Sequence, residues 1–105
     1  MIYVTVSYRI KPEFVPENKA NIDKFLKDFK SLDTSGFEYR VFLKEDGKTF
    51  VHTSSYVDVS VQNKILNVPS FLEFQRRRDE SGLNDSHLVE ILECIGGTSQ
   101  PLQNG

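Results

Sequence analysis

The sequence has a single cysteine, no tryptophan and no strong excess of charge of either sign. Its one cysteine, Cys94, excludes an internal disulfide and a cysteine-based zinc cluster in a chain of 105 residues, and it suits a reducing compartment. The 13 basic residues are matched by 15 acidic ones, so no general attraction to nucleic acid or anionic lipid is expected. We therefore expect neither nucleic acid nor a membrane surface as a partner.

Long apolar runs are also missing. No stretch could span a bilayer, and the first residues alternate instead of forming a signal peptide, so we expect a cytoplasmic protein. We expect one domain over residues 1–97, followed by a flexible tail at residues 98–105, which are mostly small and polar. A chain of this length buries a limited core, and a partner subunit would help to stabilise it.

Alternating patterns predict four strands. Apolar and polar residues alternate over residues 2–10, which is typical of a strand with one strongly apolar face. Residues 36–57 then read as two strands joined by a turn at Glu45-Asp46-Gly47-Lys48, with Gly36 at positive φ and the second strand over residues 49–57. A last strand is predicted over residues 87–95.

Two helical regions separate these strands. Apolar residues recur every three or four positions over residues 16–32, and Pro16 suits the first turn of a helix. Asp58 can cap a short helix that reaches residue 66. Pro69 predicts a break, and Ser70 followed by Glu73 reads as a capping box for a second piece.

The order strand, helix, strand, strand, helix, strand predicts an α+β fold. It is the ferredoxin-like β-α-β-β-α-β sandwich, a four-stranded antiparallel sheet with both helical regions on one face. Val41, Phe42 and Leu43 follow one another, so both faces of the second strand carry apolar side chains. We therefore expect the open sheet face to pack against that of a second copy in a homodimer.

The residues resemble the dimeric α/β-barrel superfamily, and within it the antibiotic biosynthesis monooxygenase-like domains. The resemblance spans residues 1–97. It depends on Lys11-Pro12 after the first strand, on Gly36-Phe37 and Tyr39, on Phe50-Val51-His52 followed by Tyr56 and Asp58, and on Val68-Pro69-Ser70-Phe71.

The resemblance implies an activity but not a shared set of catalytic residues. Members of the superfamily include oxygenases that use no cofactor, haem-degrading enzymes, isomerases and domains of no known activity. Many carry tryptophan where this chain has Tyr56, and helix histidines where it has Ile65 and Ser70. A haem-degrading activity is the least similar, since this chain has no tryptophan.

The candidate site residues lie mainly on the two central predicted strands. His52 is the candidate catalytic base or hydrogen-bond donor, because an imidazole titrates near neutral pH and can donate or accept a proton; a structural role is its alternative. The candidate substrate-binding residues are those that can line a pocket between sheet and helices, namely Tyr39, Tyr56, Ile65 and Phe71.

For the other reactive or charged side chains a structural role is expected, not a functional one. We expect His87 at an exposed edge, and the carboxylates and histidines show no metal-ligand spacing, so no metal site is predicted. The run Arg76-Arg77-Arg78 reads as a solvated helix face, since consecutive helical residues point in different directions. Cys94 reads as a small core residue.

Two functions remain open from the sequence. The first is a homodimeric monooxygenase without cofactor, acting on a small aromatic or quinol-like molecule; dioxygen would react with a substrate carbanion, so neither metal nor flavin would be needed. The second is a non-catalytic dimeric ligand-binding or scaffold domain of the same fold. A cavity filled by Phe25, Phe29, Ile65 and Phe71 would favour the second.

Overall fold

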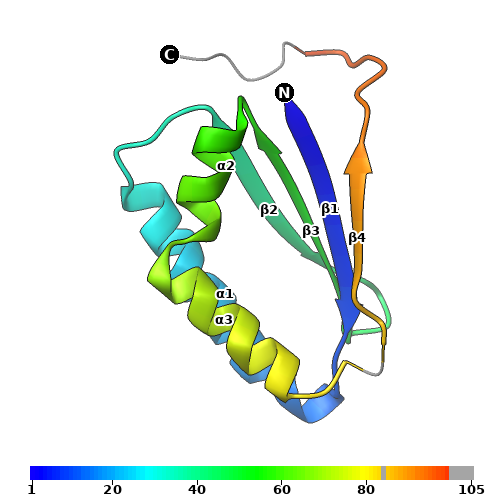
Figure 1. The fold of residues 1–105 in the computed structure, drawn as a ribbon. Coiled ribbons are helices and arrows are strands. Elements are labelled where there is room, and N and C mark those ends of the chain that lie inside the picture. Colours follow the sequence, from blue (N-terminus) through cyan, green and yellow to red (C-terminus); the bar gives the residue numbers. More distant parts are fainter. Residues whose placement is uncertain (84, 100–105) are drawn as a thin grey trace.

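The chain folds into one antiparallel sheet covered on one face by helices. The computed structural model describes residues 1–83 and 85–99. Its strands are β1 (Ile2–Arg9), β2 (Phe37–Leu43), β3 (Thr49–Tyr56) and β4 (Leu88–Leu92), in the sheet order β2-β3-β1-β4 with every neighbouring pair antiparallel (Figure 1). The α+β, ferredoxin-like arrangement predicted from the sequence is confirmed.

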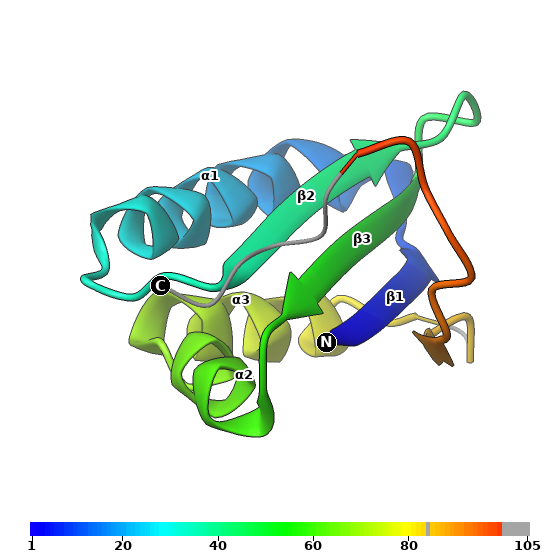
Figure 2. The same ribbon diagram turned by 90° about the horizontal axis from the view of Figure 1, so that it is seen from above.

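The helices all lie on the same side of the sheet (Figure 2). A short 3-10 turn, η1 (Pro12–Phe14), leads into α1 (Val15–Ser31), and α2 (Val59–Leu66) is followed by α3 (Pro69–Glu80). Pro16 stands in the first turn of α1, where its missing N–H costs no hydrogen bond. The bent second helical region is therefore two helices, separated ahead of Pro69 as predicted.

The N-termini of α2 and α3 are capped differently. Oδ1 of Asp58 accepts a hydrogen bond from the backbone N–H of Val61 at 2.9 Å, so the predicted cap of α2 is present. The capping box predicted at Ser70 and Glu73 is wrong, because α3 begins after Val68 without a side-chain cap. Glu73 pairs with arginines one turn further along the helix instead.

The turn between β2 and β3 is closed by a carboxylate. Asp46 accepts hydrogen bonds from the backbone N–H groups of Lys48 and Thr49 and from the hydroxyl of Thr49. Those bonds hold the pKa of Asp46 down to about 2. The turn fixes the register in which Val41 faces His52, and β1 on the other side places Val6 opposite His52 as well.

The core lies between the sheet and the helices and is largely aromatic. Its centre is Phe25 of α1, fully buried, whose ring lies within 5.6 Å of the rings of Phe29, Tyr39, Phe71 and Phe74. The buried apolar residues are Tyr8, Ile10, Ile22, Phe25, Phe29, Phe50, Tyr56, Ile65, Val68, Phe71 and Phe74. The core therefore fills much of the space under the helices and leaves an opening at one side.

The last strand is shorter than predicted. It covers Leu88–Leu92, and residues 93–99 continue as irregular chain along the sheet face opposite the helices (Figure 2). Cys94 falls in this segment and is exposed, so its prediction as a core residue is wrong. Of the tail predicted at residues 98–105, positions 100–105 lie outside the described residues, and the domain boundary stays a prediction.

None of the helices formed by the described residues combines the length and the apolar character that crossing a bilayer requires.

Candidate functional site

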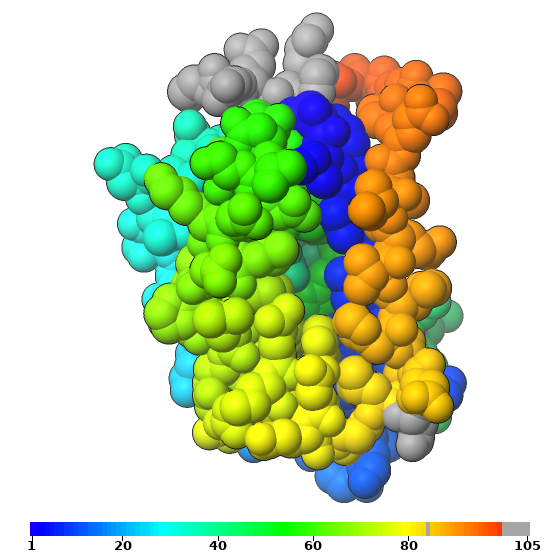
Figure 3. Space-filling view, viewed as in Figure 1, coloured from blue at the N-terminus to red at the C-terminus, as the bar shows by residue number. Residues whose placement is uncertain are grey.

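A cleft of ≈ 240 Å³ opens between the helices and the edge of the sheet formed by β4. In the space-filling view it lies between α3 and the orange β4, with β1 at its floor (Figure 3). The strands contribute Val4, Val6, Tyr39, His52, Ser54, Tyr56, Val89 and Ile91 to its lining, together with His87 just before β4. The helices contribute Gln62, Leu66, Phe71, Gln75 and Arg78.

His52 stands at the inner end of this cleft between two tyrosines. Its Nε2 lies 2.8 Å from the phenolic oxygen of Tyr8, and its Nδ1 lies 2.8 Å from that of Tyr39. The imidazole is 2% exposed, and aromatic rings of the core surround it. Both ring nitrogens are therefore engaged, and the ring cannot rotate without breaking two hydrogen bonds.

A further contact orients the hydrogen bonds of this group. Nδ2 of Asn18, a fully buried residue of α1, donates to the phenolic oxygen of Tyr8 at 3.0 Å. We assign Nε2 of His52 as the acceptor of the Tyr8 hydroxyl proton, which puts the imidazole proton on Nδ1 and makes Nδ1 the donor to Tyr39. The proton of Tyr39 is then left to point into the cleft, which this residue lines.

Burial keeps this chain of groups neutral. Burial first, and then the positive charge of Arg78, lower the pKa of His52 to about 3. Burial likewise raises the pKa of Tyr8 and of Tyr39 above the ordinary phenol value. At neutral pH the cleft therefore holds a neutral imidazole and neutral phenols, which act as hydrogen-bond donors and acceptors.

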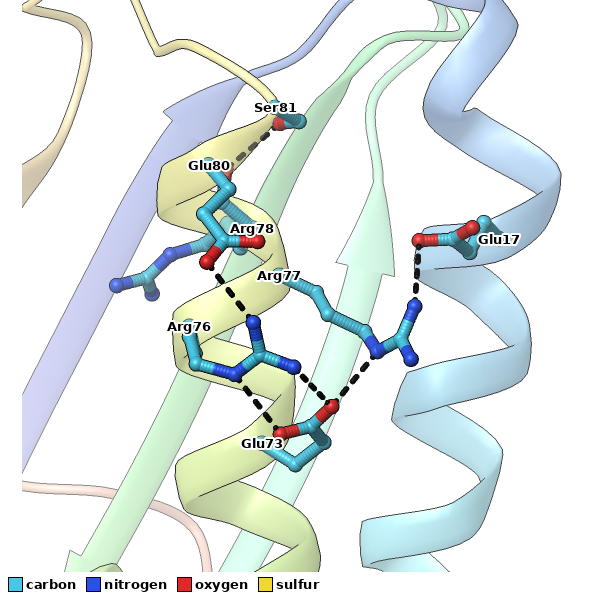
Figure 4. Close-up of polar contacts among 7 residues, drawn as sticks. All are labelled: Glu17, Glu73, Arg76, Arg77, Arg78, Glu80 and Ser81. Atoms are coloured by element: carbon cyan, nitrogen blue, oxygen red, sulfur yellow. Dashed lines mark hydrogen bonds and ion pairs between the residues drawn. The ribbon is translucent and has the colours of Figure 1, made fainter.

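Arg78 is the functional candidate that the sequence interpretation missed. Arg76 and Arg77 form exposed ion pairs with Glu73, Glu80 and Glu17 of the neighbouring helix, as a solvated face would (Figure 4). Arg78 leaves α3 on the opposite side from Arg77, is 6% exposed and lines the cleft (Figure 4). The solvated-face prediction is thus wrong for Arg78.

A signal for Arg78 is present in the sequence. Phe71, Phe74 and Arg78 follow one another at spacings of three and four, so Arg78 continues the buried stripe of α3. The guanidinium carbon lies 5.2 Å from the ring centre of Tyr8 and 5.5 Å from that of Phe74. Helical periodicity therefore identifies Arg78 as a buried residue. Treating the three consecutive arginines as one group hides this difference.

The predicted substrate-binding residues divide into two groups. Tyr39, Tyr56 and Phe71 line the cleft together with His52. Ile65 is fully buried in the core and does not reach the lining, whereas its neighbour Leu66 does. The sequence interpretation also passed over Gln62 and Gln75, the amide side chains that α2 and α3 present to the cleft.

His87 lies at the cleft, near the end of the sheet where β4 begins. It is exposed, as predicted, and partial desolvation of its ring by the cleft, followed by the positive charge of Arg78, lowers its pKa. The fold thus brings two histidines distant in sequence to one cleft. Among residues 1–83 and 85–99, however, no three His, Cys, Asp or Glu side chains form a set that could hold a metal ion.

A larger hollow of ≈ 820 Å³ lies on the other face of the sheet. It is formed by Met1, Tyr3, Glu38 and Ser55 together with residues 92–97 and Ser99. None of the candidate site residues lines it. We therefore place the candidate site in the smaller cleft, where buried polar groups converge.

Comparison with known proteins finds solved structures of similar fold but no protein of similar sequence. No protein-family model matches the chain, and none of the curated proteins does. A solved structure named as an antibiotic biosynthesis monooxygenase matches with a TM-score of 0.78 at 13% identity, over 91% of this chain and 100% of that one.

Two further structures agree with it. Rv0793 from Mycobacterium tuberculosis matches with a TM-score of 0.76 at 18% identity, over 93% of this chain and 98% of its own. PA3566 from Pseudomonas aeruginosa matches with a TM-score of 0.73 at 14% identity, over 90% of this chain and 94% of its own. Likeness at such identities concerns the fold: the chain has the fold of the antibiotic biosynthesis monooxygenase-like domains, as its sequence patterns predicted.

Proposed function

We propose that the cleft binds a small planar aromatic or quinol-like molecule and that the protein oxygenates it with dioxygen, without metal or flavin. The observation that carries this proposal is the placement of His52 between two phenols at the inner end of an aromatic cleft. Flat rings of Tyr56 and Phe71 can pack against a flat ligand, and the free hydroxyl proton of Tyr39 can bind a ligand oxygen. The fold shared with a structure named as a monooxygenase supports the same class of reaction.

The chemistry can be balanced with substrate and dioxygen alone. An anthrone loses a proton from its central CH₂ to a water molecule and becomes a carbanion. The carbanion gives its electrons to dioxygen and forms a carbon–oxygen bond, and the resulting peroxide anion takes a proton back from water. The resulting hydroperoxide loses water, so one oxygen atom stays as the quinone carbonyl and the other leaves as water. The protein would contribute orientation, exclusion of bulk water and stabilisation of the ionised substrate.

Of the two roles proposed for His52, hydrogen bonding fits its surroundings better than general base catalysis. A pKa of about 3 gives an imidazole little affinity for a proton at neutral pH. Its Nδ1–H instead donates to Tyr39 and leaves the phenol proton for the ligand. We assign orientation of the substrate to Tyr39, Tyr56 and His52, and contact with its ring to Phe71.

Oxygen uptake tests the proposal. We expect uptake with anthrones or naphthohydroquinones above the spontaneous rate, and a clear loss of turnover in His52→Ala and Tyr39→Phe. Tyr3→Phe, on the sheet face away from the helices, is the matched control and should keep full activity. Nil uptake with these substrates would refute the enzyme, and unchanged binding and turnover in His52→Ala would refute the role of His52.

A non-catalytic ligand-binding or scaffold domain is the second candidate function. Ile65 occupies the core where many relatives are expected to carry a histidine, and Phe25, Phe29 and Phe71 fill much of the interior. This function predicts saturable binding of an aromatic ligand without oxygen uptake. Calorimetry and an oxygen electrode on the same sample separate the two functions.

We further propose a cytoplasmic homodimer formed through the sheet face opposite the helices. Phe42, Leu88 and Leu92 expose 51%, 52% and 47% of their surfaces, and the strand alternation places them on that face. Light scattering at micromolar concentration should give twice the mass of the chain, and Phe42→Glu should shift it toward the monomer. A monomer at that concentration contradicts the dimer.

A further inference from the structure

Arg78 is an unusual member of a cleft wall, because it is a cation buried among aromatic rings. Its guanidinium is held over Tyr8 and Phe74, which fixes its plane before any ligand arrives. Only 6% of the residue is exposed, and that residue lines the cleft. A buried cation of this kind is stable only when a counter-charge or hydrogen-bond acceptors balance it.

The neighbouring acceptors balance it in part. Within the described residues, Nε and Nη2 of Arg78 both contact one oxygen, Oδ1 of Asp79, at 3.0 Å. The side chain of Asp79 is 60% exposed, so water weakens this pair. A guanidinium has five N–H groups, and Nη1 makes no hydrogen bond within the described part of the chain.

The rest of the cleft provides no negative charge. No Asp or Glu occurs among the described residues that line it, and Asp79 itself does not line it. The two histidines of the lining have lowered pKa values and are neutral at pH 7. At that pH, Arg78 therefore carries the one formal charge among the described residues that line the cleft. A neutral ligand would leave this charge without a partner inside the cleft.

We infer that the ligand of this cleft is an aromatic acid, a flat ring system carrying an anionic oxygen that Arg78 receives. The anionic group is a carboxylate, phenolate or enolate, each of which offers oxygens to the planar N–H donors of a guanidinium. Tyr39, from the β2 side, lines the same cleft, and its hydroxyl is a second hydrogen-bonding group for the ligand. This inference rests on the proposed function, in that the cleft is taken as a ligand site, and it adds the charge of the ligand.

A matched pair of ligands tests the charge preference. Naphthoate and its neutral amide, naphthamide, have the same flat rings and nearly the same size, and they differ in charge. In titration calorimetry near neutral pH we expect the 105-residue chain to bind naphthoate at least about tenfold more tightly than naphthamide, because a hydrogen bond to a charged partner is stronger than a neutral one. Equal affinity, a preference for the amide, or no binding of either ligand overturns the inference.

Variants on the same helix locate the effect. Arg78→Gln should abolish the preference for naphthoate, Arg78→Lys should keep part of it, and Arg77→Gln, which removes an exposed arginine from the next position, should keep all of it. Retained preference in a folded Arg78→Gln protein, judged by circular dichroism, overturns the inference. If that variant does not fold, the ligand pair on the unchanged protein and on Arg78→Lys decides.

The failure of this inference can be told from the failure of the proposed function. Oxygen uptake with anthrone and equal binding of the two naphthalene ligands would keep the enzyme and reject the charge preference. A naphthoate preference without oxygen uptake would keep the charge preference and select the non-catalytic function. The two measurements are therefore independent readouts of the same cleft.

Discussion

The phenolic oxygen of Tyr8 lies 2.8 Å from Nε2 of His52, although the two residues are 44 positions apart in the chain. β1 and β3 pair so that Tyr8 faces Phe50 and Val6 faces His52, which sets the tyrosine and the histidine diagonally across two neighbouring strands. Asn18 of α1 fixes the other side of the phenol. The orientation of the candidate site is thus set by sheet register and by one helix contact.

Removing the hydroxyl of Tyr8 should destabilise the fold more than removing that of Tyr39. Tyr8→Phe leaves Nε2 of His52 and Nδ2 of Asn18 buried without a partner, so we expect a loss of about 1–3 kcal/mol in the free energy of unfolding. Tyr39 lines the cleft, where water can replace its hydroxyl, and Tyr39→Phe should cost about 1 kcal/mol or less. Urea unfolding of both variants measures the difference, and equal losses would contradict Nε2 of His52 as the acceptor of the Tyr8 hydroxyl proton.

Acid should destabilise the protein partly through His52. Its pKa is ordinarily about 6.5 and is lowered to about 3 in the fold, so between these values the unfolded chain binds a proton that the folded chain excludes. The stabilising contribution is therefore fully present above about pH 6.5 and decreases as the pH falls toward 3.

Urea unfolding between about pH 7 and about pH 4 measures this contribution. The free energy of unfolding should fall less steeply in His52→Gln than in the unchanged protein. Asp46 and Glu73, whose pKa values are lowered to about 2, act mainly below this range. His87→Gln is the comparison with an exposed imidazole; the pKa of His87 is lowered too, so its slope should change in the same direction but less than that of His52→Gln. Identical slopes for all three proteins would show that His52 is not held neutral by its burial.

Substitutions at Ile65 and Phe71 should affect the free energy of unfolding and the ligand affinity differently. Ile65 is fully buried away from the cleft, so Ile65→Val should cost about 0.5–1.5 kcal/mol of stability and leave ligand affinity unchanged. Phe71 lies in both the core and the lining, so Phe71→Leu should lower stability and weaken aromatic binding several-fold. Calorimetry with naphthoate and urea unfolding check both variants; weakened binding in folded Ile65→Val would return Ile65 to the substrate-binding residues.

Two glycines at positive φ offer a matched pair for strain. Gly36 has a φ of 84°, and a Cβ there would lie 2.7 Å from Cγ2 of Val57. Gly47 has a φ of 75° with no atom within 4 Å of such a Cβ. Gly47→Ala should therefore cost about 1–2 kcal/mol for its backbone conformation alone, and Gly36→Ala a further 1–3 kcal/mol or so for the contact. Thermal unfolding of the two variants compares them, and equal transition temperatures would show that Val57 yields freely.

The sequence predicted the fold well because local patterns carry it. Alternation predicts Tyr39 on the helix-facing side of its strand, and Gly36 and Asp46 mark the start and the turn of the hairpin. The contact between Tyr8 and His52 depends on the register of two strands, which alternation does not give. Asn18 reads as an ordinary polar helix residue until the helix is placed on the sheet.

The errors also have physical reasons. The sequence interpretation treats the three arginines as one solvated face because consecutive helical residues point in different directions, but helical spacing puts Arg78 on the stripe of Phe71 and Phe74. Cys94 was assigned to a strand face, but the strand ends at Leu92 and the residues after it leave the sheet. In each case the side chain's surroundings follow from where an element points or stops, which residue type alone does not reveal.

The edge strand β4 forms one wall of the cleft, and this wall is less buried than the wall formed by the helices. Among the described strands, β4 is hydrogen-bonded to β1 alone. All five of its residues are exposed, and Val89 and Ile91 line the cleft on that side. Segments with so little buried surface open locally at low free energy. A ligand held between β4 and the helices should therefore slow amide hydrogen exchange in β4 more than in β3.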